Sequence, residues 1–211
     1  MNDASASRLA KLVDPATTAV VTMEMQRGVA GDLAMMTQLR DEMEAHGIID
    51  NLVTLVGSAR HANATIVHCT AESRADRAGQ ALNCRLLAAT VGSDSFVVEG
   101  TEGADLIPQL DGFDTDIRLP RMHGLTPFTS TSLDQVLRNM SIQTIVATGN
   151  SVNVGVLGLV LSAIDLGYQV VLPRDAVGAV PQSFVDVAIA NTLGLLTTVT
   201  TTAELLDLWS T

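Results

Sequence analysis

The sequence has few aromatic residues, few cysteines and few basic residues. Aromatic side chains make up 3% of the 211 residues, so a pocket walled by aromatic rings has few candidates beyond Phe128, Tyr168, Phe184 and Trp209. Two cysteines are too few to suggest a disulfide scaffold. Lysine and arginine number 12 against 23 aspartates and glutamates, and the formal net charge is −11. Nucleic acid is therefore not an expected partner, because its phosphates require a basic surface.

Long uninterrupted apolar runs are also missing, although 47% of the residues are hydrophobic and the mean hydropathy is +0.31. No stretch is long enough to cross a bilayer, and the N-terminal residues lack the basic and apolar segments of a secretory signal. We therefore expect a cytoplasmic protein with no membrane partner. The apolar excess predicts self-association as a homodimer or homotetramer, because a monomer of this size would expose hydrophobic surface.

Strand and helix patterns alternate along the chain, which is typical of a doubly wound α/β sheet. The patterns predict strands at residues 17–24, 64–70, 96–99, 115–119, 144–149, 169–173 and 198–200. They predict helices at residues 48–63, 81–91, 132–140, 153–167, 181–197 and 203–209, with a helical turn at 105–110 and a loop at 120–128. No linker or repeat interrupts this order. The prediction is one domain, residues 1–211, folded as a three-layer αβα sandwich around a mostly parallel, Rossmann-like sheet of about six strands.

Residues 144–176 form the most informative segment. A β-branched run ends in Gly-Asn-Ser, an apolar helix follows, and a second strand begins at Gln169. Such a strand–helix–strand unit packs as a right-handed parallel crossover. Ligands of open parallel sheets bind beyond the carboxyl ends of the strands, and the unpaired N–H groups of a helix N-terminus point toward that edge. The turn at residues 149–155 is therefore the predicted place of a site.

The motif Gly-Asn-Ser-Val-Asn-Val-Gly-Val at residues 149–156, followed by the apolar helix and Gly-Tyr-Gln-Val at 167–170, resembles the isochorismatase-like hydrolase superfamily. The resemblance extends from about residue 15 to residue 209. Most members of that superfamily carry a nucleophilic cysteine where this chain has Gly155. The chain is similar to the branch that lacks this cysteine. The resemblance implies a hydrolase whose site combines an acid, a lysine and the turn before the helix.

Glu24 is the strongest candidate for the acid. It follows a buried strand and lies between Met23 and Met25. Partial desolvation favours the protonated carboxyl, which is the state that a general acid requires. The superfamily has an aspartate in a similar pattern, so the carboxyl here sits on an arm one methylene longer. The alternative is a structural ion pair at the end of the strand.

The loop at residues 120–128 holds the candidates for the lysine position. An alignment without a gap places Met122 there, and one inserted residue places Arg121 there instead. The Arg121 guanidinium could pair with Glu24 or hold a substrate carboxylate, or it could be an ordinary solvated side chain. His123 could exchange protons near neutral pH, although isolated loop histidines are usually not catalytic.

In the turn, Asn150, Ser151 and Gly155 are predicted to bind substrate. The resemblance implies a cis peptide bond around Asn150–Ser151 that aims backbone N–H groups at the substrate. Gly155 cannot be a nucleophile but lets a ligand come close; its alternative role is helix packing. Ser151 could replace the missing nucleophile, yet no adjacent base is visible in the sequence.

Two further side chains complete the predicted binding set. Gln80 belongs to a loop at residues 72–85 that is rich in hydrogen-bond donors and could hold an anionic substrate, although any single loop arginine is more simply explained as solvated. Phe128 belongs to the tail of the lysine-containing motif. The zinc-binding Asp-x-His of metal-dependent relatives is missing beyond the second strand, so we expect no metal and no cofactor.

These observations predict a metal-free hydrolase of a small, anionic metabolite. In an isochorismatase-type reaction, Glu24 would protonate the vinyl carbon of an enol ether and water would capture the resulting cation, with no covalent nucleophile. Two alternatives stay open. One is a catalytically inactive binding or regulatory protein, and the other is amide or lactam hydrolysis by water that Glu24 activates.

Overall fold

The computed structural model describes residues 3–90 and 97–210. Its centre is a sheet of six strands in the order β3-β2-β1-β4-β5-β6, and each neighbouring pair is parallel. The strands are β1 (Thr18–Met23), β2 (Thr65–Ala71), β3 (Ile117–Arg121), β4 (Thr144–Gly149), β5 (Gln169–Pro173) and β6 (Thr198–Thr200). The predicted parallel α/β sheet is confirmed.

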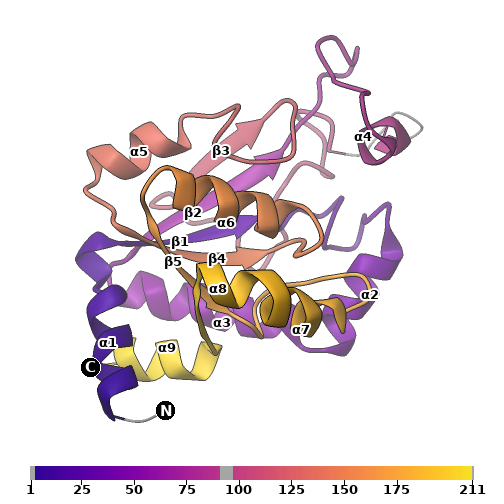
Figure 1. Ribbon diagram of the computed structural model, residues 1–211. Coiled ribbons are helices and arrows are strands. Elements are labelled where there is room, and N and C mark those ends of the chain that lie inside the picture. The colour runs from indigo at the N-terminus through magenta and orange to yellow at the C-terminus, as the bar shows by residue number, and fades with distance from the viewer. Residues whose placement is uncertain (1–2, 91–96, 211) are drawn as a thin grey trace.

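Helices cover both faces of this sheet (Figure 1). One face packs against α1 (Asp3–Leu12), α2 (Thr37–Ala45), α3 (Ile48–His61) and α9 (Thr202–Trp209). The other face packs against α5 (Leu133–Asn139), α6 (Gly155–Asp165), α7 (Phe184–Ala188) and α8 (Gly194–Leu196). A short helix, α4 (Arg85–Ala89), lies beyond the end of the sheet toward which the strands run. The three-layer sandwich follows from these two separate hydrophobic cores.

The two central strands, β1 and β4, are buried along their whole length. Their sequences, TAVVTM and TIVATG, are apolar runs rather than alternating patterns, as expected where both faces of a parallel sheet are covered. Alternate residues serve alternate cores: Val20 and Val146 face the α3 side, and Val21 and Ala147 face the α6 side. The register pairs Met23 with Gly149, so the two strands end side by side.

The strand order places a topological switch point between β1 and β4. From this pair the chain proceeds outward to β2 and β3 on one side and to β5 and β6 on the other. In open α/β sheets a crevice forms at such a point, and ligands bind there. Glu24 follows β1 directly and Asn150 follows β4 directly. Both therefore stand at the mouth of this crevice.

Several of the predicted elements differ in the structure. The strand predicted at 96–99 begins outside the described residues, and its remainder forms only an isolated bridge between Ser73 and Val98, because Val97 has a φ of +42° that breaks the extended backbone. The residues predicted as a helical turn at 105–110 form non-helical turns, with a bridge from Leu106 to Gln26. The strand predicted at 115–119 runs instead from Ile117 to Arg121. Proline is tolerated there because β3 is an edge strand.

The helix predicted at 181–197 begins only at Phe184 and is interrupted by a π-helical turn, Ile189–Leu193. The Gln182 side chain holds the preceding residues as a turn by accepting from the Ala179 N–H and donating to the Val177 carbonyl. No helix was predicted at α1 or α2, whose sequences are more polar than that of α3. Within the described ranges, no helix has the length and apolar character needed to cross a membrane.

A buried polar network links β2 to the segment before β3. His68 contacts Thr22 Oγ1 through Nδ1 at 2.8 Å and Asp116 Oδ2 through Nε2 at 3.0 Å, and Arg60 donates to the same carboxylate. The order Thr–His–Asp is that of a catalytic triad, but Thr22 and His68 are fully buried. No substrate could reach this hydroxyl, and we interpret the network as structural.

We expect Asp116→Asn to lower the free energy of unfolding by about 3 kcal/mol at pH 7, because it breaks a buried ion pair. Burial alone would raise the pKa of Asp116, but hydrogen bonds from His68 and Arg60 outweigh burial and the pKa is lowered. The carboxylate therefore stabilises the fold fully above about pH 4, the ordinary pKa of an aspartate in an unfolded chain. This contribution is lost as the pH falls through the lower pKa of the folded state. Urea unfolding between pH 7 and pH 3 measures the difference between wild type and variant.

The control is Asp111→Asn, which removes an exposed ion pair with Arg118 and should change stability by less than about 1 kcal/mol. A difference between wild type and Asp116→Asn that stays constant over the whole pH range would contradict this interpretation.

Candidate functional site

A pocket of about 580 Å³ opens beyond the carboxyl ends of the four strands β1 to β4. Its volume lies within the usual range of small-molecule sites. Besides the strand ends, its lining comes from the segment between β1 and α2, from the loop that carries α4, from the residues after β3 and from the turn before α6. The pocket therefore occupies the crevice at the switch point.

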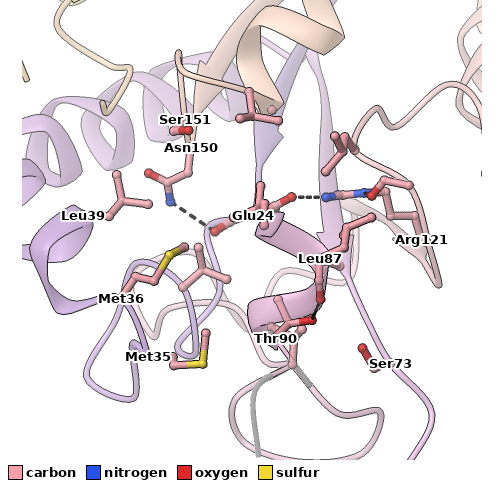
Figure 2. Close-up of a pocket in the computed structure, with 18 of the residues that line it drawn as sticks. Glu24, Met35, Met36, Leu39, Ser73, Leu87, Thr90, Arg121, Asn150 and Ser151 are labelled. Carbon is pink, nitrogen blue, oxygen red and sulfur yellow. Dashed lines mark hydrogen bonds and ion pairs between the residues drawn. The ribbon is translucent and has the colours of Figure 1, made fainter. Parts of the chain in front are cut away.

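Glu24 lies at the centre of this pocket (Figure 2). Its backbone N–H donates to the Cys69 carbonyl at 2.8 Å, which continues the pairing of β1 with β2 by one residue. Its φ is +50°, a left-handed conformation that non-glycine residues rarely adopt. Where such residues do occur, they are often at functional sites. The side chain is one-fifth exposed, so it can meet a ligand.

Arg121 forms an ion pair with the Glu24 carboxylate. It is the last residue of β3, and its side chain is only 5% exposed. Its Nε donates to the Gly124 carbonyl at 3.1 Å, while Nη1 is buried without a hydrogen-bond partner among the described residues. Met122, the other candidate for the lysine position, is 48% exposed at the edge of the pocket. The chain's single lysine, Lys11, lies in α1.

The turn before α6 forms the opposite side of the site. Asn150 is buried, and its amide donates to the backbone oxygen of Glu24 at 3.3 Å (Figure 2). The Asn150–Ser151 peptide bond is cis, as the resemblance implies. The backbone N–H groups of Ser151 and Gly155 have no acceptor within the described part of the chain. Two free N–H groups in a pocket wall can hold a carbonyl oxygen or an oxyanion.

Gly155 is the first residue of α6, and its backbone is closely packed. A Cβ added there would lie 2.6 Å from the Asn150 carbonyl oxygen, so no larger side chain fits without a backbone shift. The Ser151 hydroxyl makes no hydrogen bond to any described residue, and no base therefore activates it. This turn offers N–H donors rather than a nucleophile.

The remaining predicted residues divide into two groups. Gln80 and His123 line the pocket; Gln80 donates to Thr90 Oγ1 at 2.9 Å, and His123 is exposed at the rim. Phe128 is not among the residues that line this pocket. Its ring packs into the α6-side core and stacks on Tyr168 with a centroid distance of 5.9 Å. The sequence could not reveal this partner, which lies far along the chain, directly before β5.

Neither cysteine is suited to nucleophilic attack. Burial raises the pKa of the Cys69 thiol to about 12, so the reactive thiolate is scarcely formed. Cys84 is exposed but does not line the pocket.

Sequence reasoning missed the apolar wall of the pocket. Met35, Met36 and Leu39 lie along one side of Glu24, and Leu87 of α4 lies on another side (Figure 2). The methionines belong to a segment with neither helix nor strand periodicity. The consecutive pair Met35-Met36 in a polar stretch was the only signal, and it predicted no particular structure.

The site combines a carboxylate after β1, a cation at the end of β3 and a donor-rich turn after β4. All of it lies within the part of the chain that matches a known family model. That model describes the isochorismatase domain and matches residues 18–204. The chain belongs to the isochorismatase domain family. The predicted resemblance is confirmed at this level, and the family supports a hydrolase activity.

Solved structures agree with this assignment. A cysteine hydrolase from Pseudomonas syringae matches with a TM-score of 0.75 and 22% identity, covering 94% of this chain and 95% of its own. An isochorismatase family protein from Burkholderia thailandensis matches with a TM-score of 0.74 and 25% identity, covering 93% and 97%. An N-carbamoylsarcosine amidase from Thermoplasma acidophilum matches with a TM-score of 0.67 and 20% identity, covering 88% and 96%. At such identities the comparison shows the fold.

Proposed function

We propose that the protein hydrolyses a small molecule with water as the nucleophile and Glu24 as the group that transfers the proton. One observation carries the proposal: the Glu24–Arg121 pair lines the same pocket as Ser151 and Gly155, whose backbone N–H groups have no acceptor among the described residues. A proton-transferring carboxylate and an oxyanion-holding pair of donors are the two elements that hydrolysis of a carbonyl compound requires.

The ion pair supports one of the two chemical roles of Glu24 over the other. Arginine remains charged in proteins, and its charge-assisted hydrogen bond is made to a carboxylate. This supports Glu24 as a base that removes a proton from water, in place of the general acid expected from the sequence. The water oxygen then bonds to the carbonyl carbon, and the oxyanion accepts from the Ser151 and Gly155 N–H groups. As the tetrahedral intermediate collapses, Glu24 passes the proton to the leaving amine or alkoxide.

The proposal involves no covalent intermediate with the protein and no metal. Gly155 carries no side chain, and burial keeps the Cys69 thiol protonated. In the described ranges, no three His, Cys, Asp or Glu side chains are grouped so that they could hold a metal ion. N-carbamoylsarcosine amidase shares the fold, and its name indicates that the same scaffold can act on an amide.

We expect activity to survive the removal of both thiols. A Cys69→Ala/Cys84→Ser variant and iodoacetamide-treated wild type should keep most of their turnover, because neither thiol touches the reaction. Hydrolysis is assayed by product formation with hexanamide, nicotinamide and isochorismate as trial substrates. Mass spectrometry confirms that Cys84 is alkylated and tests whether a quenched reaction contains an acyl-protein. Loss of activity in proportion to alkylation, or an accumulating acyl-protein, would show that a covalent route operates instead.

A further inference from the structure

The charged side chains that line the pocket leave no cation for an anionic ligand. Glu24, Glu72 and Arg121 line it, and His123 lies exposed at its rim. The Arg121 charge is matched by Glu24. Burial, and then the neighbouring Glu99, raise the pKa of Glu72, so this region already disfavours negative charge. Residues 91–96 have the sequence VGSDSF and supply no lysine or arginine. A carboxylate on the part of the ligand that lies away from the Arg121 end would therefore lose its hydration without gaining a charged partner.

The loop arginines that suggested an anionic substrate lie elsewhere. Arg74, Arg77 and Arg85 are not among the residues that line the pocket. Arg74 instead pairs with Asp76 at 2.7 Å on the surface. The loop arginines are therefore not donors of the site, whereas Gln80 of the same loop does line it.

Apolar side chains form most of the remaining wall. Met35, Met36, Leu39, Leu86, Leu87 and Met122 all line the pocket. Met36 is 42% exposed and Met122 is 48% exposed, and both would lose contact with water when an apolar ligand enters. Methionine side chains are flexible and polarisable, so they can follow the shape of an aliphatic chain.

Donors without a partner occur at the Arg121 end of the pocket, and the side-chain oxygens of two other lining residues, Gln80 and Asn150, also lack a partner among the described residues. Arg121 Nη1 is buried and unpaired among the described residues, and the free Ser151 and Gly155 N–H groups belong to the same pocket. A ligand with one neutral hydrogen-bonding group and an apolar remainder would satisfy these donors and cover the methionines.

We propose that the pocket selects an uncharged, largely aliphatic amide or ester and discriminates against substrates that carry a carboxylate on the chain. This inference rests on the proposed function only in naming an amide or ester as the group that is hydrolysed. The polarity of the lining is a property of the site whether or not turnover follows. It replaces the anionic metabolite expected from the sequence.

The test uses three ligands with the same six-carbon amide skeleton: hexanamide, 5-carbamoylpentanoate and 6-aminohexanamide. Binding to the wild-type protein is measured by ligand-observed NMR and calorimetry, and hydrolysis is measured separately. Hexanamide should bind about 100-fold more tightly than 5-carbamoylpentanoate, because a buried carboxylate without a partner is strongly disfavoured. Shortening hexanamide to butanamide should weaken binding about fourfold for each methylene removed.

A substitution in the wall tests the cause. Met36→Lys places a cation in the pocket and should improve the binding of 5-carbamoylpentanoate relative to hexanamide by at least tenfold. The matched control is Leu33→Lys, because Leu33 is 45% exposed in the same segment but does not line the pocket. Its ligand preference should equal that of wild type.

The outcomes separate this inference from the proposed function. Selective binding of hexanamide without hydrolysis would support the ligand class and remove the hydrolase proposal for this reaction. Equal or tighter binding of 5-carbamoylpentanoate by wild type, or no binding of any member of the series, would overturn the ligand class. Equal effects of Met36→Lys and Leu33→Lys would overturn the assigned cause.

Discussion

Glu24→Gln is expected to lower kcat/KM by about 100-fold or more, the scale of an essential proton-transferring group. The amide keeps the shape of the side chain and can still accept from Arg121, but it cannot take a proton from water. Initial rates across a substrate series, together with a thermal melt of each variant, separate this loss of chemistry from a loss of folded protein.

Two further variants serve as controls for Glu24→Gln. Glu24→Asp keeps the carboxylate on an arm one methylene shorter, so it should retain more activity than Glu24→Gln. Glu72→Gln removes a second carboxylate that lines the pocket but does not pair with Arg121, and it should cost less than tenfold. Turnover by Glu24→Gln within tenfold of wild type would remove Glu24 from the reaction. A protein that only binds its ligand would show no turnover to lose, and Glu24→Gln would then alter affinity alone.

Local sequence patterns were sufficient for the centre of the fold. The bounds predicted for β4 and β5 match the structure, because each is a β-branched run with a glycine or proline at its end. Glu24 was identified by its place after a buried strand, and parallel strands bring their carboxyl ends to one edge of the sheet. The position of the crevice therefore follows from pattern and topology together.

The ion pair could not be predicted with the same certainty, since Glu24 and Arg121 are 97 residues apart in sequence. Whether Arg121 or Met122 faces the site depends on how far β3 extends past Pro120. That extension is possible only because β3 lies at the edge of the sheet, and strand order is not a local property.

The polarity of the pocket was the least predictable feature. Loop arginines looked suitable for an anion in the sequence, but composition does not show which way a loop directs its side chains. The methionine wall combines the segment before α2 with α4 and the end of β3. The segment before α2 has no periodic pattern, and the three segments form one surface only in the folded chain.

Gly149→Ala is expected to lower the free energy of unfolding by more than about 3 kcal/mol. Gly149 has a φ of +95°, and a Cβ there would lie 2.4 Å from the Met23 carbonyl oxygen and 2.7 Å from the Met23 nitrogen. Both atoms belong to the central strand β1, which is packed on both sides and cannot move aside. The same Met23 oxygen accepts from the Asn150 N–H at 2.8 Å, so the shift needed to relieve the clash would also displace the turn of the site.

Gly167→Ala is the matched control, because Gly167 has a φ of +89° and nothing within 4 Å of an added Cβ. It should cost only about 1 kcal/mol, the effect of the backbone conformation alone. Urea unfolding of the two variants therefore separates strain in φ from steric conflict with β1. Any folded Gly149→Ala protein should also lose ligand binding, because Asn150 and Ser151 follow the substituted residue directly. Equal stability losses in the two variants would show that the close approach of Met23 to Gly149 is not what requires glycine at this position.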